Sequence, residues 1–272
     1  MASNPAVEHL LRRDRAITIT ALGILCGLAW LYIVSGAGLG MDARDMASLA
    51  LLPSGGGHDM MGGPAWSLGV GALFVAMWWV MMIAMMVPSA APTILLYARV
   101  HRHARAQGRI SDDIAPIGAF VMGYLCVWLI YAFAATALQW MLVNLGVVSA
   151  MTIGSRSQWL SGGILLAAGL YQFTPLKQAC LSHCRSPAAF LSRYWKPGRS
   201  GALRLGMMHG AYCVGCCWLL MTLLFVGGVM NVVWIAAITL LVLAEKLLPP
   251  GPWVARIAGT IFAIWSGVTL VA

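Results

Sequence analysis

Charged residues are scarce in this sequence. Only 9% of its 272 residues are Asp, Glu, Lys or Arg, and 61% are hydrophobic, whereas a soluble globular chain carries roughly 25% charged residues. This composition excludes a water-soluble globular protein. It predicts an all-α, polytopic transmembrane helix bundle, because a helix satisfies its own backbone hydrogen bonds where no water is present.

Nucleotide-binding motifs are absent as well. The chain has no Gly-x-x-x-x-Gly-Lys-Ser/Thr sequence and no phosphorylated-aspartate signature. Any transport would therefore be passive or coupled to an ion gradient. The sequence also lacks an internal repeat and a linker long enough to separate a soluble domain, so residues 1–272 are expected to form a single membrane domain.

Long apolar runs are what the sequence does contain. A spanning helix needs about 20 mostly apolar residues, and seven runs approach that length: 17–38, 67–97, 114–142, 158–174, 204–227, 230–248 and 253–271. The loops on one side of these runs hold all the Lys and Arg residues except Arg44 and Arg156. By the positive-inside rule, the N-terminus is cytoplasmic and the C-terminus lies outside.

The net charge of +9 is explained by the same membrane topology. These cations flank membrane spans, where they orient the protein and meet anionic headgroups. The bilayer is therefore the expected partner, and a nucleic acid is not.

The seven cysteines do not resemble a disulfide framework. Five lie inside apolar runs, namely Cys26, Cys126, Cys213, Cys216 and Cys217, and Cys180 and Cys184 fall on the reducing cytoplasmic side. We expect free thiols or metal ligands.

The fifth apolar run carries the strongest candidate site. At 100° per residue, four polar side chains share an arc of about 120° with two glycines: His209, Cys213, Cys216 and Cys217, with Gly206 and Gly210. Glycines four apart allow close helix packing, so this face should point into the bundle. Thiolate and imidazole suit Cu(I), Zn(II) or iron–sulfur chemistry. The alternative is that the cysteines pack as small hydrophobes and the histidine bonds a neighbouring helix.

The second run adds thioethers. Met81 and Met85 share a helical face with Pro88 and Pro92, and thioether sulfur selects soft cations. They are auxiliary ligand candidates, with adaptable core packing as the alternative.

Two further groups lie in loops. Cys180 and Cys184, if helical, lie one turn apart beside His183 in the inner segment 175–203, and would need another ligand from elsewhere. In the outer loop, His58, Asp59, Met60 and Met61 could capture a cation.

Several of these stretches together resemble the predicted metal-binding integral membrane proteins of uncharacterised domain family 2182. The resemblance covers roughly residues 65–250 and leaves the first span and outer loop, 1–64, outside it. Its motifs are Met85–Ala90, Tyr171–Pro187, His209–Trp218, Met230–Asn231 and Glu245–Lys246. It implies metal binding and a bacterial inner membrane, without a mechanism.

We therefore expect a membrane protein that handles a soft transition metal, most plausibly copper, as a transporter or a delivery factor for a metal-donor or metal-acceptor protein. A membrane thiol-redox or haem-linked component is one alternative, and a structural subunit of a membrane complex is another. The sequence carries no indication of oligomeric state.

Overall fold

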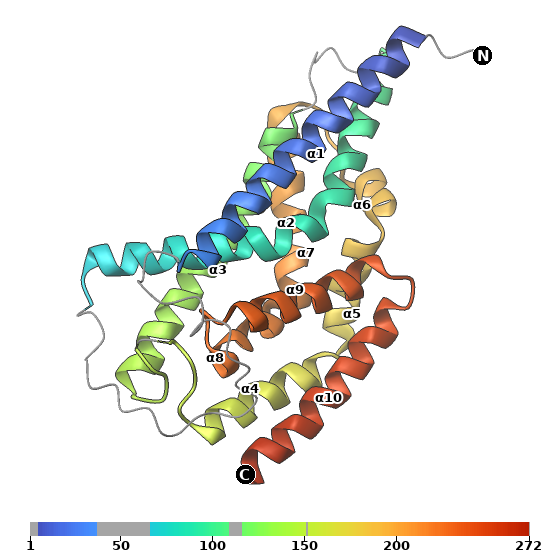
Figure 1. Ribbon diagram of the computed structural model, residues 1–272. Coiled ribbons are helices and arrows are strands. Elements are labelled where there is room, and N and C mark those ends of the chain that lie inside the picture. The colour runs from blue at the N-terminus through green and yellow to red at the C-terminus, as the bar shows by residue number, and fades with distance from the viewer. Residues whose placement is uncertain (1–4, 37–65, 109–115, 151, 272) are drawn as a thin grey trace.

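The computed structural model describes residues 5–36, 66–108, 116–150 and 152–271, with side chains from residue 15 onward (Figure 1). The helices are α1 (Pro5–Val34), α2 (Leu68–Ala106), α3 (Ile117–Asn144), α4 (Gln158–Tyr171), α5 (Pro175–Arg185), α6 (Pro187–Tyr194), α7 (Gly198–Thr222), α8 (Leu224–Gly227), α9 (Val232–Leu247) and α10 (Gly251–Val271). Across these described segments the only β-structure is an isolated bridge between Val148 and Ser155. The all-helical fold expected from the composition is confirmed.

Side-chain caps fix where several helices begin. Ser67 precedes α2 and accepts a hydrogen bond from the Val70 amide, and Asn231 does the same for two amides at the start of α9. Thr174 caps α5 and is followed by Pro175, whose missing N–H costs nothing in the first turn. Each cap satisfies amides that have no partner within the helix.

Helix α2 contains both prolines of the second apolar run, Pro88 and Pro92. Each removes a backbone hydrogen bond inside the helix, which allows a bend. Figure 1 shows α2 changing direction about halfway along its length.

Five helices are long and apolar enough to cross a membrane: Arg15–Val34, Leu68–Ala106, Ile117–Asn144, Gly198–Gly227 and Gly251–Val271. They correspond to five of the seven expected runs. Helices α4 and α9 occupy the other two, and their lengths of 14 and 16 residues fall below the roughly 20 needed for a perpendicular crossing.

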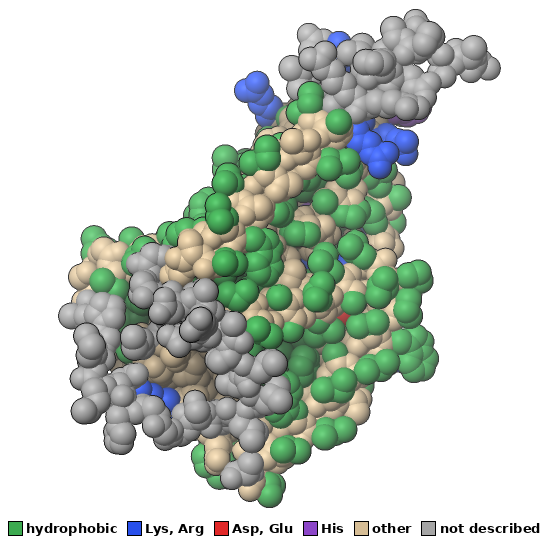
Figure 2. Space-filling model, viewed as in Figure 1, with side chains coloured by type: hydrophobic (Ala, Val, Ile, Leu, Met, Phe, Trp, Pro, Cys, Tyr) green, Lys and Arg blue, Asp and Glu red, His purple; other side chains and the backbone are tan. Residues whose placement is uncertain are grey.

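The outer surface is apolar. In Figure 2 hydrophobic side chains cover most of the described face in view, and visible Lys and Arg atoms gather mainly toward the end where α1 begins. Large exposed side chains include Leu31, Ile130, Phe133, Leu240 and Ile264, each more than half exposed. Such a surface is unfavourable in water and suited to lipid.

The inner segment 175–203, expected as a loop, folds into α5 and α6 and the start of α7. Helix α5 packs against α7 and buries Lys177 and Leu181, while α6 buries Phe190 and Leu191. The segment therefore forms one wall of the interior instead of a solvated connection.

Helices α3 and α7 approach closely because each presents a glycine to the backbone of the other. A Cβ atom at Gly206 would overlap the Phe120 carbonyl oxygen, and one at Gly123 would lie 2.9 Å from the Met207 amide nitrogen. Glycine permits this separation, since any other residue would push the backbones apart.

We predict that Gly206→Ala destabilises the protein by about 1–3 kcal/mol, because the added methyl group overpacks a backbone contact. The measurement is the free energy of unfolding in detergent. Gly118→Ala is the matched control on α3, where the Cβ would meet nothing within 4 Å. An equal effect of the two substitutions would argue against a glycine-dependent contact.

Candidate metal centre

Sulfur atoms from three helices meet in the interior. Cys213, Cys216 and Cys217 lie on α7, and each is 1% exposed. The Cys184 thiol of α5 hydrogen bonds with Cys213 and Cys216, and the Met86 sulfur of α2 lies 3.8 Å from the Cys217 sulfur. We call these five residues the sulfur cluster.

The glycines of α7 explain why this face points inward. Besides Gly206, Gly210 lies against α3, where a Cβ would come within 3.1 Å of the Tyr124 carbonyl oxygen. On the other side, Cys180 of α5 packs over Gly215, whose Cβ would lie 2.8 Å from the Cys180 sulfur. The predicted burial of the α7 face is confirmed.

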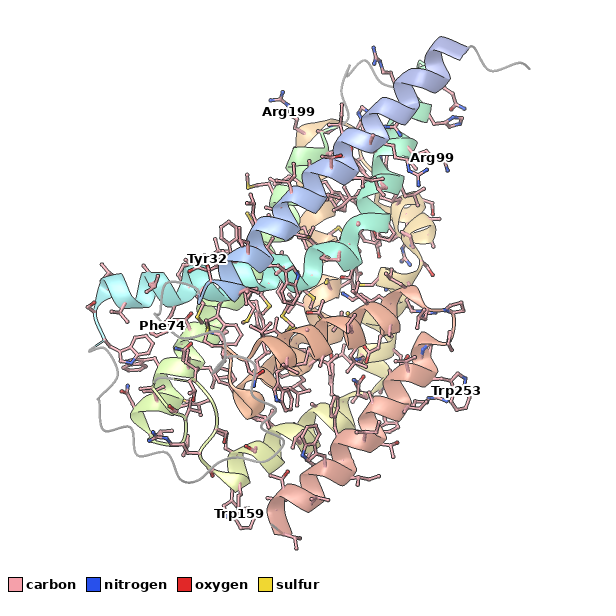
Figure 3. The ribbon with its side chains drawn as sticks, in the orientation of Figure 1. Tyr32, Phe74, Arg99, Trp159, Arg199 and Trp253 are labelled. Atoms are coloured by element: carbon pink, nitrogen blue, oxygen red, sulfur yellow. The ribbon has the colours of Figure 1, made fainter. Side chains whose placement is uncertain are left out.

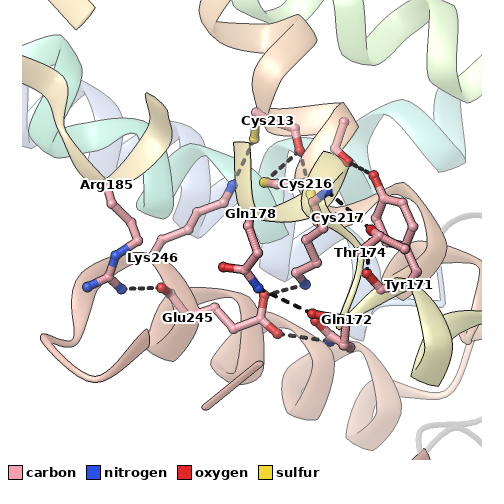
Figure 4. A network of polar contacts seen from close by, with 12 residues as sticks. Tyr171, Gln172, Thr174, Gln178, Arg185, Cys213, Cys216, Cys217, Glu245 and Lys246 are labelled. Atoms are coloured by element: carbon pink, nitrogen blue, oxygen red, sulfur yellow. Dashed lines mark hydrogen bonds and ion pairs between the residues drawn. The ribbon is translucent and has the colours of Figure 1, made fainter. Parts of the chain in front are cut away.

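Lys246, near the end of α9, reaches into the sulfur cluster. Its Nζ lies 2.9 Å from the Cys213 sulfur (Figure 4). It also lies 3.2 Å from the Ser89 hydroxyl oxygen. The Tyr124 hydroxyl lies 3.1 Å from the same sulfur. The Cys213 sulfur is therefore contacted by hydrogen-bonding groups from α3 and α9.

A second polar layer lies beside Lys246. Glu245 accepts hydrogen bonds from Lys177 Nζ at 2.7 Å and from Gln172 Nε2 at 2.9 Å, and Lys177 is fully buried. Arg185 donates to the carbonyl oxygens of Leu248 and Pro249, at 2.7 and 2.8 Å. These bonds join α5 to the end of α9 (Figure 4).

The α7 thiols are turned toward their own helix. Cys216 and Cys217 donate to the Cys213 carbonyl oxygen, at 3.1 and 2.8 Å. Within the described residues no three His, Cys, Asp or Glu side chains are already arranged to hold a metal ion. An ion bound to this cluster would need the thiols to rotate to new rotamers.

The Cys184 thiol interacts with two thiols of α7. Hydrogen bonding with Cys213 and Cys216 raises the pKa of the Cys184 thiol well above its ordinary value, and burial raises it further. The residue as a whole is only partly buried, so Cys184 connects the cluster to the surface of α5.

His209 lies in an aromatic pocket one turn from Cys213. Its ring centroid is 5.7 Å from that of Tyr124, 6.1 Å from Phe120 and 5.4 Å from Phe190. The side chain is 2% exposed, and its Nδ1 has no hydrogen-bond partner among the described residues. A buried nitrogen without a partner is available to bind an ion or a proton.

The remaining predicted residues lie on α2, on α5 or outside the described residues. Met81 and Met85 are buried on α2, where Met86 contacts Cys217. His183 stacks on Tyr212, with ring centroids 4.1 Å apart and an interplanar angle of 7°. The outer-loop group, His58, Asp59, Met60 and Met61, lies outside the described residues.

The sequence places Lys177 and Lys246 with the cations of the inner side, but both are buried and bind groups of the interior. The sequence signal for Lys246 is the Glu245–Lys246 pair at the end of an apolar run, since ionisable residues at membrane depth mark functional sites. No such signal marks Lys177, whose burial follows from the packing of α5.

Residues 75–269 match the family described as PpoB2, copper chaperone. The chain belongs to this family. The match includes the whole sulfur cluster and most of α10 and excludes α1. It ends at residue 269, whereas the sequence resemblance was expected to end near residue 250. No curated protein and no solved structure matches the chain.

We predict that Lys177→Met costs about 3–5 kcal/mol of unfolding free energy, because Glu245 would be left buried without a cation. The double variant Lys177→Met with Glu245→Gln should recover most of the loss, since the charge is removed and the acceptor for Gln172 is kept. Detergent unfolding measures both. A double variant as unstable as the single one would contradict this role of the pair.

Proposed function

We propose that this protein is a membrane-embedded copper carrier that takes Cu(I) onto the sulfur cluster and hands it on, either to a partner protein or across the bilayer. The convergence of four thiols and one thioether from α2, α5 and α7 carries the proposal. Membership of a family described as a copper chaperone supports it.

The chemistry of the cluster suits a soft cation. Thiolate and thioether sulfur favour Cu(I) over hard ions, and Cu(I) tolerates low coordination numbers, so two or three of these sulfurs suffice. The thiols of Cys216 and Cys217 now bond to a helix carbonyl and rotate when the ion arrives. Met81, Met85 and His209 are auxiliary ligands in this proposal.

We place the exchange point with a metal-donor or metal-acceptor protein on α5. Cys180, His183 and Cys184 lie on this helix, and none is fully buried. Cys184 belongs to the sulfur cluster and is partly exposed, which offers an ion a path of successive thiols. Stepwise exchange between such weak sites is what release requires.

A thiol-redox function is the second candidate, favoured by the nearness of Cys184 to Cys213 and Cys216. All seven cysteines are free in the structure. Titration of thiols in purified protein, before and after mild reduction, separates the two functions, because a redox pair gains thiols on reduction and a copper site does not.

We further propose seven spans in a bacterial inner membrane, with the N-terminus inside and the C-terminus outside. In Figure 3, Arg99 at the end of α2 and Arg199 at the start of α7 lie toward the end of the molecule where α1 begins, and Trp159 lies toward the other end. The chain must cross the membrane an even number of times between the two arginines if both lie on the same side. Because α3 is one crossing, this arrangement supports α4 as a second, tilted crossing.

Alkaline phosphatase fusions test the topology. A fusion after Gly146, between α3 and α4, should be active, and one after Lys196, between α6 and α7, should be inactive because cytoplasmic phosphatase does not mature. A five-span topology that omits α4 and α9 predicts activity at both positions. Activity after Lys196 would therefore remove α4 from the set of spans.

Elemental analysis tests copper binding. After anaerobic loading with Cu(I), detergent-purified protein should retain copper, and a triple Ser variant at Cys213, Cys216 and Cys217 should lose it. Cys184→Ser should weaken binding about tenfold or more, a loss typical of perturbed metal sites. The control is Cys26→Ser with Cys126→Ser, which removes two cysteines outside the cluster. Equal copper content in the triple variant and the wild type would overturn the proposal.

A further inference from the structure

The ammonium group of Lys246 contacts two hydrogen-bond acceptors, the Ser89 hydroxyl oxygen and the Cys213 sulfur. The Ser89 hydroxyl donates to the Met86 carbonyl oxygen at 2.8 Å, so its oxygen is left to accept from Lys246 Nζ. The other partner of Nζ is the Cys213 sulfur, at 2.9 Å. The side chain thus sets a positive charge directly against a member of the sulfur cluster.

Among the described side chains, no carboxylate is left to balance this charge. Glu245 is the one acidic residue among those whose side chains are described, and it already binds Lys177 and Gln172. A buried ammonium without an opposite charge is strongly unfavourable. The sulfur cluster, once deprotonated by metal binding, is the remaining source of negative charge around Lys246.

We propose that Lys246 is a specificity-determining residue that makes the sulfur cluster prefer a monovalent soft cation to a divalent one. The inference rests on the proposed function and deepens it. Two thiolates carry two negative charges, and one monovalent ion together with the Lys246 ammonium neutralises them. A divalent ion on the same two thiolates leaves one positive charge buried, unless a third thiol also loses its proton.

Repulsion from Lys246 acts in the same direction. The Coulomb energy between two charges is proportional to each of them, so a divalent ion at the Cys213 sulfur is repelled twice as strongly as a monovalent ion. This difference holds whatever the number of sulfur ligands. Lys246 therefore discriminates by charge, while the sulfur atoms discriminate by softness.

Removal of the charge should shift the preference. The test uses the full chain in detergent with reduced thiols, and the probes are Ag(I), a redox-inert monovalent soft ion, and Zn(II). Equilibrium dialysis against competing chelators, followed by elemental analysis, gives the ratio of the two affinities. In Lys246→Leu, which removes the charge without adding a sulfur ligand, this ratio of Ag(I) to Zn(II) affinity should fall by about tenfold or more, whereas Lys246→Arg, which keeps the charge, should stay near the wild type.

Controls separate the possible failures. Lys196→Leu removes an exposed cation and should leave the ratio unchanged, and Lys246→Gln serves as a second neutral variant if Lys246→Leu does not fold. A wild-type protein that binds neither ion would overturn the proposed function. Wild-type binding of Ag(I) with no preference over Zn(II), or with the same ratio in the neutral variants, would overturn the role of Lys246 alone.

Discussion

The close approach of α3 and α7 is the constraint on which the interior depends. At Gly123 and Gly206, backbone atoms of the neighbouring helix occupy the space that a Cβ atom would need. Helices at this distance exclude lipid and water from between them, so the cysteine face of α7 is closed on the α3 side. Helix α5 closes the other side, because Gly215 leaves room for Cys180. The distances between the helix backbones thus determine where the sulfur cluster lies, independently of its polar contacts.

Within that enclosure, the arrangement of charge follows from the cost of burying it. The end of α9 carries two consecutive ionisable residues, and successive side chains on a helix point about 100° apart. Glu245 therefore meets Lys177 of α5 while Lys246 meets Cys213 of α7. Arg185 satisfies carbonyl oxygens at the same helix end that would otherwise lack a partner. These bonds hold α5, α7 and α9 in one register.

Periodicity and apolar length predict much of this fold, since each is a property of a single segment. The run 230–248 became α9 (Val232–Leu247), and the glycine spacing at 206 and 210 predicted which face of α7 is buried. The rotation of one helix relative to its neighbour cannot be predicted in this way, because it depends on two segments at once. The stripe containing Met81 and Met85 therefore does not reveal that Met86 contacts Cys217. In the same way, the sequence places Lys177 among the cations of the inner segment, and only the packing of α5 shows that it is buried.

The same contacts bear on whether such a centre stores an ion or exchanges it. Every sulfur that an ion would bind already has a partner, either a helix carbonyl, another thiol or the Lys246 ammonium. Binding must break these hydrogen bonds, which lowers the net affinity, because each such bond contributes about 0.5–1.5 kcal/mol. If the thiolates take protons back as the ion leaves, release restores these hydrogen bonds, and the emptied cluster is not left with bare thiolates in a low-dielectric interior. Enclosure by α3 and α5 would protect a bound ion from water, and the internal partners would lower the net affinity for it. That combination suits a carrier, whose site must empty as readily as it fills.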